Sequence, residues 1–453
     1  MRTLSFFFVV FVIAVPAFAQ PPSLASTAVK AAADKPSVGA PGQPAALNLG
    51  ELQRAAEASD PRAREISLLQ QQWELRDRNV AVQRLPAFGV DSLAQYQTDV
   101  PTSPLTTPAG TPAFVAPKKT YETLLRVEQR LFDPTLSRQA ALQRAQLAED
   151  QARVRTALYA LRQQVSDAFF AVALLDQRAG VLAAAIADLS ARASEMEARV
   201  REGTALRADF AAIEASRIQR LQEEDELRTN RRAALQRLAT IVGRPLDPAA
   251  TPVLPNLASE VSQVRAAGPQ ARGRPEFAQF ARARERLERQ REAAVVQAQP
   301  KLSAFGRVGY GRPGLNFIRD EFDTYGVGGI RLQWNAWSWG TPTRESEIAR
   351  LQGDIVTAEE EAFVRTLEQS TRTDEATIER LERTVASDAQ IISLREEVER
   401  AARARMQEGV LTAADYVTRQ SELVQSRYAR ASHDVELAQA RARLLVTLGV
   451  EVP

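Results

Sequence analysis

Residues 158–200 have the sequence LYALRQQVSDAFFAVALLDQRAGVLAAAIADLSARASEMEARV. Apolar side chains recur here at gaps that alternate between three and four residues. The positions are Leu158, Leu161, Val165, Ala168, Val172, Leu175, Ala179, Leu182, Ile186, Leu189, Ala193, Met196 and Val200. This period, about 3.5 residues, predicts a helix that supercoils left-handedly against its neighbours.

The predicted helix is unusually long. After Pro134, the only glycine or proline before Val200 is Gly180. At about 1.5 Å per residue, a helix over this span is roughly 100 Å long. Such a helix does not fit inside a compact domain, so the sequence predicts a long, thin assembly.

The composition argues against several classes of function. The 453 residues include 58 basic and 56 acidic side chains, a balance that gives no support for a nucleic-acid partner. The absence of cysteine excludes disulfides and thiolate metal sites. The one histidine, His433, lies in a helical pattern and is expected to be a packed or surface residue. No catalytic triad, phosphate-binding loop or metal-spaced cluster is apparent, so we expect neither an enzyme nor a cofactor.

The first residues are typical of an exported protein. Residues 1–19 combine Arg2, a short apolar run and Ala17-Phe18-Ala19, which is the pattern of a signal peptide. Residues 20–46 are rich in Pro, Ala and Ser and predict a flexible extension. No later stretch approaches about 18 consecutive apolar residues, so any membrane insertion is expected to use strands.

The chain is internally duplicated. Glu408-Gly409 matches Glu202-Gly203, and Asp415-Tyr416 matches Asp209-Phe210 at the same offset. Each repeat has the order helix, two strands, long helix, break, helix. The expected ranges are 47–243 for the first repeat, with strands 88–97 and 120–131, then a linker at 244–274, then 275–453 for the second repeat, with strands 302–311 and 325–334.

The second long helix keeps the apolar pattern less strictly. We call the row of residues at the alternating spacing of three and four the seam of the helix. Five polar residues occupy seam positions in this second helix: Thr371, Asp374, Asp388, Arg395 and Glu399. We expect polar residues at these positions to belong to a tube wall that is wet on at least one side.

Four strands per chain cannot close a barrel, and open sheet edges are not tolerated in lipid. Three copies would supply about twelve strands, within the range of outer-membrane barrels. Six aromatic residues near the strand ends are candidates for its interfacial girdles: Tyr121, Tyr310, Tyr325, Trp334, Trp337 and Trp339. The alternative for the tryptophans is core packing at the corner between strand and helix.

Several motifs resemble those of the TolC-like outer-membrane efflux channels. They are Leu131-Phe132-Asp133, Ala336-Trp337-Ser338, Leu47-Asn48-Leu49 with Asp60-Pro61, and the two turns of the form Gly-x5-Asp-aromatic. The resemblance implies a mainly α fold in which duplicated hairpins form a trimeric α-barrel tunnel and the strands form a shared 12-stranded β-barrel. It also implies a location in the outer membrane of a Gram-negative-type bacterium, in contact with lipid. The expected partners are two further copies of the chain, a periplasmic adaptor and an inner-membrane pump.

The same resemblance assigns roles to the periplasmic turns. Asp415 matches a position whose carboxylates ring the closed aperture, and Asp209 matches a position that latches the closed state. Thr418 stands where a second acidic ring is expected and Leu411 where a basic latch residue is expected, so both depart from the family pattern. For each Asp, an N-cap after a glycine turn is an equal alternative. The two turns form the periplasmic tip of the chain. The tip residues expected to contact the adaptor are Gly203, Arg207, Gly409 and Leu411.

Two other classes of protein are compatible with long hairpins. A periplasmic adaptor should carry a single hairpin flanked by Gly- and Val-rich segments, and here the hairpin is duplicated. A coiled-coil spacer would not need the strand pairs. The sequence leaves the cargo open among drugs, metal ions and polypeptides.

Overall fold

The computed structural model describes residues 46–105, 107–110, 114–267, 273–316 and 318–453. The expected signal peptide, 1–19, lies outside the described residues, and so does the expected extension except for Ala46. The described residues belong to one unit, Pro44–Pro453.

This unit is mainly helical, as the sequence predicts. The elements of the first half are β1 (Ala46–Leu47), α1 (Leu49–Ser59), α2 (Ala63–Val82), β2 (Ala87–Tyr96), β3 (Lys119–Phe132), α3 (Pro134–Tyr159), α4 (Leu161–Arg201) and α5 (Arg207–Val242). Those of the second half are β4 (Thr251–Pro252), α6 (Ala258–Ala267), α7 (Pro275–Val296), β5 (Lys301–Arg312), β6 (Asp323–Gln333), α8 (Thr341–Gln407) and α9 (Ala413–Thr447). Each of the four long strands begins and ends within two residues of its expected first and last residues.

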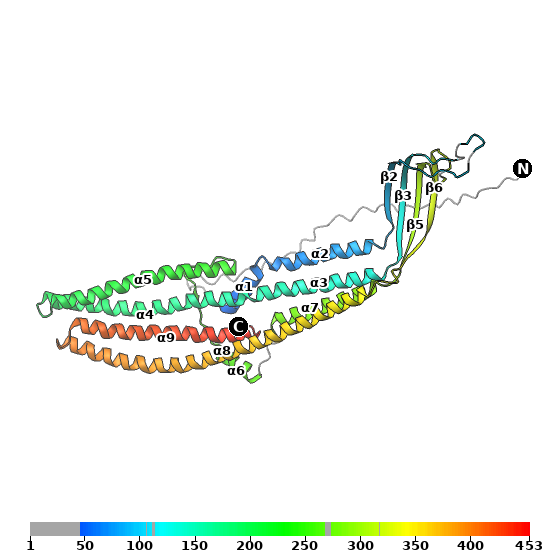
Figure 1. Cartoon of the computed structure of the whole chain (residues 1–453). Helices are drawn as coiled ribbons and strands as arrows, with labels where there is room; N and C mark the ends of the chain where they lie inside the picture. Colours follow the sequence, from blue (N-terminus) through cyan, green and yellow to red (C-terminus); the bar gives the residue numbers. More distant parts are fainter. Residues whose placement is uncertain (1–45, 106, 111–113, 268–272, 317) are drawn as a thin grey trace, which may run out of the picture. The chain divides into compact units, whose positions relative to one another are not determined.

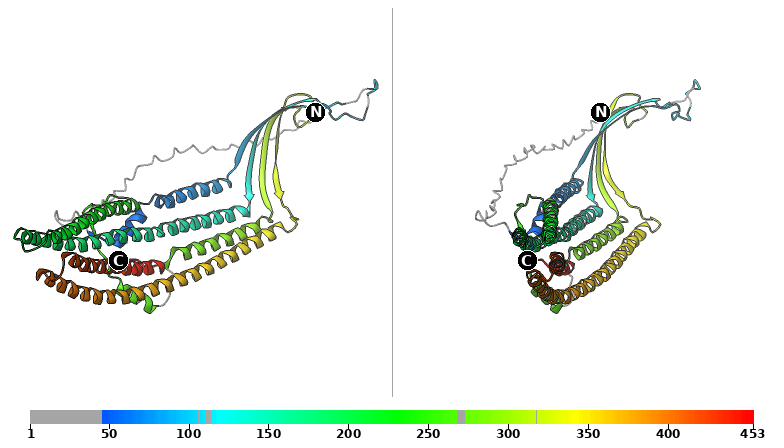
Figure 2. Two further views of the ribbon diagram at one scale, coloured as in Figure 1. Left: turned by 60° about the vertical axis from the view of Figure 1, so that its left-hand side comes forward. Right: turned by 90° about the vertical axis from the view of Figure 1, so that its left-hand side faces the viewer.

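The duplication appears directly in the element order. α2, β2, β3, α3–α4 and α5 of the first half correspond to α7, β5, β6, α8 and α9 of the second (Figure 1). The four long strands form one antiparallel sheet in the order β2-β3-β5-β6. Within this unit, each strand continues a helix, and the sheet lies at the opposite end from the α4–α5 and α8–α9 turns (Figure 2).

The long helix begins where the sequence predicts and is interrupted once. The Asp133 side chain accepts a hydrogen bond from the Thr135 N–H, and Pro134 occupies the first helical position. The helix is divided at Ala160, which separates α3 from α4. Ala160 keeps right-handed helical angles, and its N–H still bonds to Thr156 O at 3.2 Å. The direction of the helix therefore continues through the break.

The seam with the 3.5-residue period faces the core. Nine of its thirteen apolar residues are buried, and the remaining four (Leu175, Ala179, Ile186 and Val200) are half-buried. Val165, Val172 and Leu182 have no exposed surface. α4 packs against α5, α9 and α1, so the seam faces the core as its period predicts.

The polar seam of α8 requires a correction. Thr371, Asp374, Asp388 and Glu399 are buried against α9 rather than wet. Asp374 Oδ1 lies 3.1 Å from Arg443 Nε. The next contact along the seam joins Asp388 to the single histidine, with 2.6 Å between Asp388 Oδ2 and His433 Nδ1. Because a buried charge is tolerated only with a partner, Asp374 and Asp388 occupy seam positions where α9 supplies one.

One described helical stretch, Pro134–Arg201, is long and apolar enough to cross a membrane by length and composition. This criterion averages hydropathy over a window, whereas the expectation concerned about 18 consecutive apolar residues, and Asp176 and Arg178 interrupt the apolar run. The stretch packs against α5 and α9, and 33% of its most apolar window is buried in the single chain. A core helix of this kind meets the same criterion, so this is weak evidence for a membrane span.

The buried carboxyl of Asp374 predicts a pH effect on stability. Burial raises its pKa, although the Arg443 charge and the Thr447 hydrogen bond oppose the shift. A carboxyl whose pKa is raised by folding favours the folded state below its unfolded pKa, and this contribution is lost as the pH rises through the folded pKa. We expect the free energy of unfolding of the wild type, minus that of Asp374→Asn, to fall as the pH rises above about 4. Denaturant titrations followed by circular dichroism measure this difference, and a difference that rises with pH would contradict the assignment.

Candidate functional site

The two helical turns at the end away from the sheet have the same backbone structure. Gly203 and Gly409 have φ of 74° and 73°, a left-handed conformation that favours glycine. Thr204 N–H bonds to Arg199 O and Val410 N–H bonds to Arg405 O, each at 2.9 Å. In each bond an N–H donates to the carbonyl five residues earlier, which is the pattern of a Schellman motif. The motif satisfies carbonyl groups in the last turns of α4 and α8.

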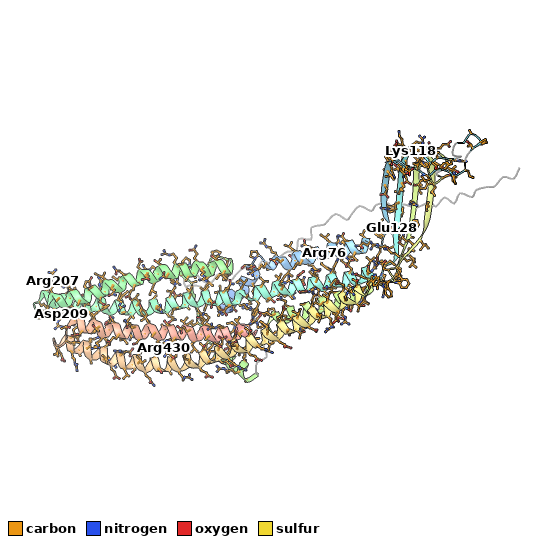
Figure 3. All side chains as sticks on the ribbon, in the orientation of Figure 1. Arg76, Lys118, Glu128, Arg207, Asp209 and Arg430 are labelled. Carbon is orange, nitrogen blue, oxygen red and sulfur yellow. The ribbon has the colours of Figure 1, made fainter. Side chains whose placement is uncertain are left out.

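Asp209 joins the two hairpins. It lies at the third position of α5, and its Oδ1 accepts a hydrogen bond from the Ala413 N–H at 3.0 Å. Ala413 is the first residue of α9, so Asp209 satisfies a free N–H at the start of a helix in the other hairpin. Figure 3 shows Arg207 and Asp209 together at this end, well away from Glu128 on β3 and from Lys118, which directly precedes β3.

Asp415 belongs to a local cap. Thr412, rather than Asp415, is the N-cap of α9, and its hydroxyl accepts from the Asp415 N–H at 3.2 Å. The same hydroxyl donates to Asp415 Oδ2 at 2.7 Å. The residue is exposed, so its second carboxylate oxygen remains available at the surface.

The remaining tip residues have simpler environments. Thr418 is exposed and donates its hydroxyl to Ala414 O at 3.0 Å. Leu411 packs at the edge of an apolar cluster around Met196. Arg207 begins α5 and is exposed.

A buried polar network between the hairpins was not identified from the sequence. The Tyr416 hydroxyl lies 2.8 Å from Asp188 Oδ2 and 3.1 Å from Glu399 Oε1, so two carboxylates share one proton donor. Arg403 bridges the same two carboxylates, at 3.3 Å from Asp188 and 2.7 Å from Glu399. Tyr416 is fully buried, and burial raises its pKa, with the Asp188 hydrogen bond adding to the shift. The only sign of this network in the sequence is Glu399, an acidic residue at a seam position where an apolar residue is expected.

The register of the four-stranded sheet separates its side chains onto two faces. The apolar face carries Phe88, Val90, Tyr96, Tyr121, Leu125, Val127, Val308, Tyr310, Ile330 and Leu332. The charged face carries Asp91, Glu122, Arg126, Glu128, Arg130, Lys301, Arg307, Asp323 and Arg331. No described residue covers the apolar face: Phe88 and Val90 are each 71% exposed, and Ile330 is 69% exposed.

The aromatic candidates divide between the two faces and the helix end. Tyr121 and Tyr310 lie on the apolar face near the loops. Tyr325 requires a correction, because its pairing with Gly309 puts it on the charged face, where only a glycine leaves room for its ring. Trp334, Trp337 and Trp339 lie at the helix end and are 59%, 75% and 79% exposed, so they are not core residues.

No protein-family model and no curated protein matches this sequence. Solved structures do match. "Crystal structures of CusC review conformational changes accompanying folding and transmembrane channel formation" describes a structure that is 13% identical, with a TM-score of 0.66, over 89% of this chain and 92% of that chain. The outer-membrane protein VceC from Vibrio cholerae is 16% identical, with a TM-score of 0.63, over 89% and 96% of the two chains.

The MtrE outer-membrane channel of Neisseria gonorrhoeae, solved in its open state, is 19% identical to this chain. Its TM-score is 0.63, and the match covers 89% of each chain. At these identities the likeness establishes the fold: the chain is folded like the TolC-like outer-membrane channels.

The polar network predicts that Tyr416→Phe loosens the tip. The change leaves the buried carboxylate of Glu399 and the half-buried carboxylate of Asp188 with one proton donor fewer, which typically costs about 1–3 kcal/mol. We expect the distance distribution between spin labels at Thr204 and Val410 to broaden. Tyr428→Phe on the same helix is the matched control, because among the described residues the Tyr428 hydroxyl has no hydrogen-bond partner. Equal broadening in both variants would contradict the conclusion that the Tyr416 hydrogen bonds hold the two hairpins together.

Proposed function

We propose that this chain, which has the fold of the TolC-like outer-membrane channels, is the exit duct of an export system. In this proposal three copies form a channel through the outer membrane and periplasm, and a periplasmic adaptor and an inner-membrane pump deliver the cargo. The observation that carries it is a four-stranded sheet with an exposed apolar face and two open edges. A water-soluble adaptor or coiled-coil spacer would leave this apolar face and these edges exposed to water.

The height of the apolar face suits a membrane. Tyr310 pairs with Thr324, and Trp334 lies ten residues further along the chain. Ten strand residues span about 33 Å, which a strand tilt of about 40° reduces to roughly 25 Å. This equals the usual height of the apolar band of an outer-membrane barrel, so the two aromatic levels fit its two interfaces.

The open edges favour several copies. β2 and β6 each pair with one strand, so the backbone N–H and C=O groups of their other edges have no strand partner within the described chain. In lipid those groups must be satisfied, and only a closed barrel does so. Three copies supply about twelve strands and remove every edge.

The helices also present apolar surface that a neighbouring copy would cover. Leu68, Leu75 and Val82 recur every seven residues on α2 and are 58–60% exposed. Ile348, Leu351 and Ile355 form a second exposed row on α8. Heptad spacing is the pattern of a helix–helix interface, which supports contact between copies along the tunnel wall.

The tip is the proposed contact with the adaptor. Leu206 and Val410, one beside each turn, are 71% and 73% exposed. Exposed apolar side chains at two adjacent turns suit a protein partner, since burying each one on binding is favourable. Gly203, Arg207, Gly409 and Leu411 frame this surface.

The shared barrel predicts a trimer that conducts. Because each sheet has two open edges, we expect the purified protein in detergent to have three times the mass of one chain. The same preparation should form ion-conducting pores in planar bilayers. Light scattering and single-channel recording measure the two properties. A monomer that keeps its full helix and strand content would refute the shared barrel.

We also propose that Asp415 from three chains rings the aperture. Converging carboxylates attract cations, and a divalent ion can bridge them. Asp415→Ala should weaken block of the single-channel current by a divalent cation. Thr412→Ala is the control: it removes the cap partner, costs about 1 kcal/mol of stability and leaves the carboxylates in place, so block should persist. Identical block in wild type and Asp415→Ala would exclude Asp415 from the aperture.

A further inference from the structure

We propose that Arg126 and Arg307 form a basic belt inside the barrel and make this section of the channel selective for anionic solutes. The inference rests on the proposed function, because the charged face lines a lumen only when copies share a barrel. In such barrels the apolar face meets lipid and the polar face lines the lumen.

The belt follows from the strand register. Arg126 on β3 lies directly opposite Arg307 on β5, and the same row continues to Gly89 on β2 and Val327 on β6. The row therefore contains two arginines and no acidic residue. Like charges directly opposite each other across strands normally destabilise a sheet, so this pair is costly for the fold alone.

Only one of the two arginines has a carboxylate partner. Arg126 Nη1 lies 3.6 Å from Asp91 Oδ2, with both side chains about half exposed. Glu128, in the next row, lies 3.9 Å from Arg331 Nη1. Arg307 is exposed and has no ion pair within the part of the chain that the structure describes. Each copy thus contributes at least one unneutralised positive charge at this level.

The nearest unpaired acidic residues are at a different level of the sheet. Glu122 and Asp323 share a row close to the loops. That row is four residues from Arg126, or about 13 Å along the strand. This exceeds the screening length of about 8 Å at physiological ionic strength. The acidic row at the mouth therefore does not cancel the belt below it.

The chemistry of the belt points to anions. In a trimer, six guanidinium groups would surround the lumen at one level. Rings of arginine side chains select for anions in pores, and the guanidinium group binds carboxylate and phosphate groups in a bidentate manner. Solutes that carry such groups would be enriched at this level, and cations would be depleted.

The test is the reversal potential of single channels in a potassium chloride gradient at low ionic strength. Arg307→Gln should lower the permeability ratio of chloride to potassium by about twofold, and Arg307→Glu should lower it further. Arg307→Lys retains the charge and should retain the wild-type ratio. Arg126→Gln is an independent second variant and should shift the ratio in the same direction.

Lys119→Gln is the matched control. It removes the same charge from the same sheet, but the Lys119 register position is on the apolar face, so the ratio should not change. Conducting Arg307 and Arg126 variants with the wild-type ratio would overturn the belt while leaving the channel function intact. Wild-type protein that forms no conducting pore would instead overturn the proposed function, and the belt with it.

Discussion

The unpaired edges of β2 and β6 are the constraint on which the rest of the structure depends. Each edge presents a row of backbone donors and acceptors that no described strand of the same chain satisfies. Combined with an exposed apolar face, this sheet is stable in lipid only as part of a closed barrel. Each strand continues a helix, as Figure 2 shows for one chain. Closing the proposed barrel would therefore also bring the long helices of neighbouring copies side by side.

The two hairpins are held together differently along their length. At the ends of α5 and α9 farthest from the tip, apolar side chains form a large core in which Phe169 and Leu238 have no exposed surface. Towards the tip the core becomes a smaller cluster around Met196, joined to the Tyr416 network and the Asp209 hydrogen bond. Hydrogen bonds between the hairpins can be exchanged for water at modest net cost, whereas an apolar core cannot. The proposed aperture therefore lies where the hairpins are joined by a small apolar cluster and hydrogen bonds rather than by the larger core.

Three charged features of the proposed channel lie at different levels. Asp415 is exposed at the tip, the Arg126–Arg307 row lies in the sheet, and Glu122 with Asp323 lies nearest the loops. In the proposed trimer, a solute would therefore meet negative, then positive, then negative charge on its way out. Screening over about 8 Å keeps these levels electrostatically distinct.

Local features of the sequence determined the helices, their ends and the duplication. The seam from Leu158 to Val200, the Asp133 cap and the glycine turns at Gly203 and Gly409 depend only on neighbours within a few residues. Only the tertiary structure decided what the polar seam residues of α8 do, because their partners on α9 are tens of residues away. The same holds for Tyr325, whose face depends on the register with β5, and for Asp209, whose partner N–H is 204 residues further along the chain. Periodicity specifies which side of a helix or strand a residue occupies, whereas its partner depends on which distant segment packs against that side.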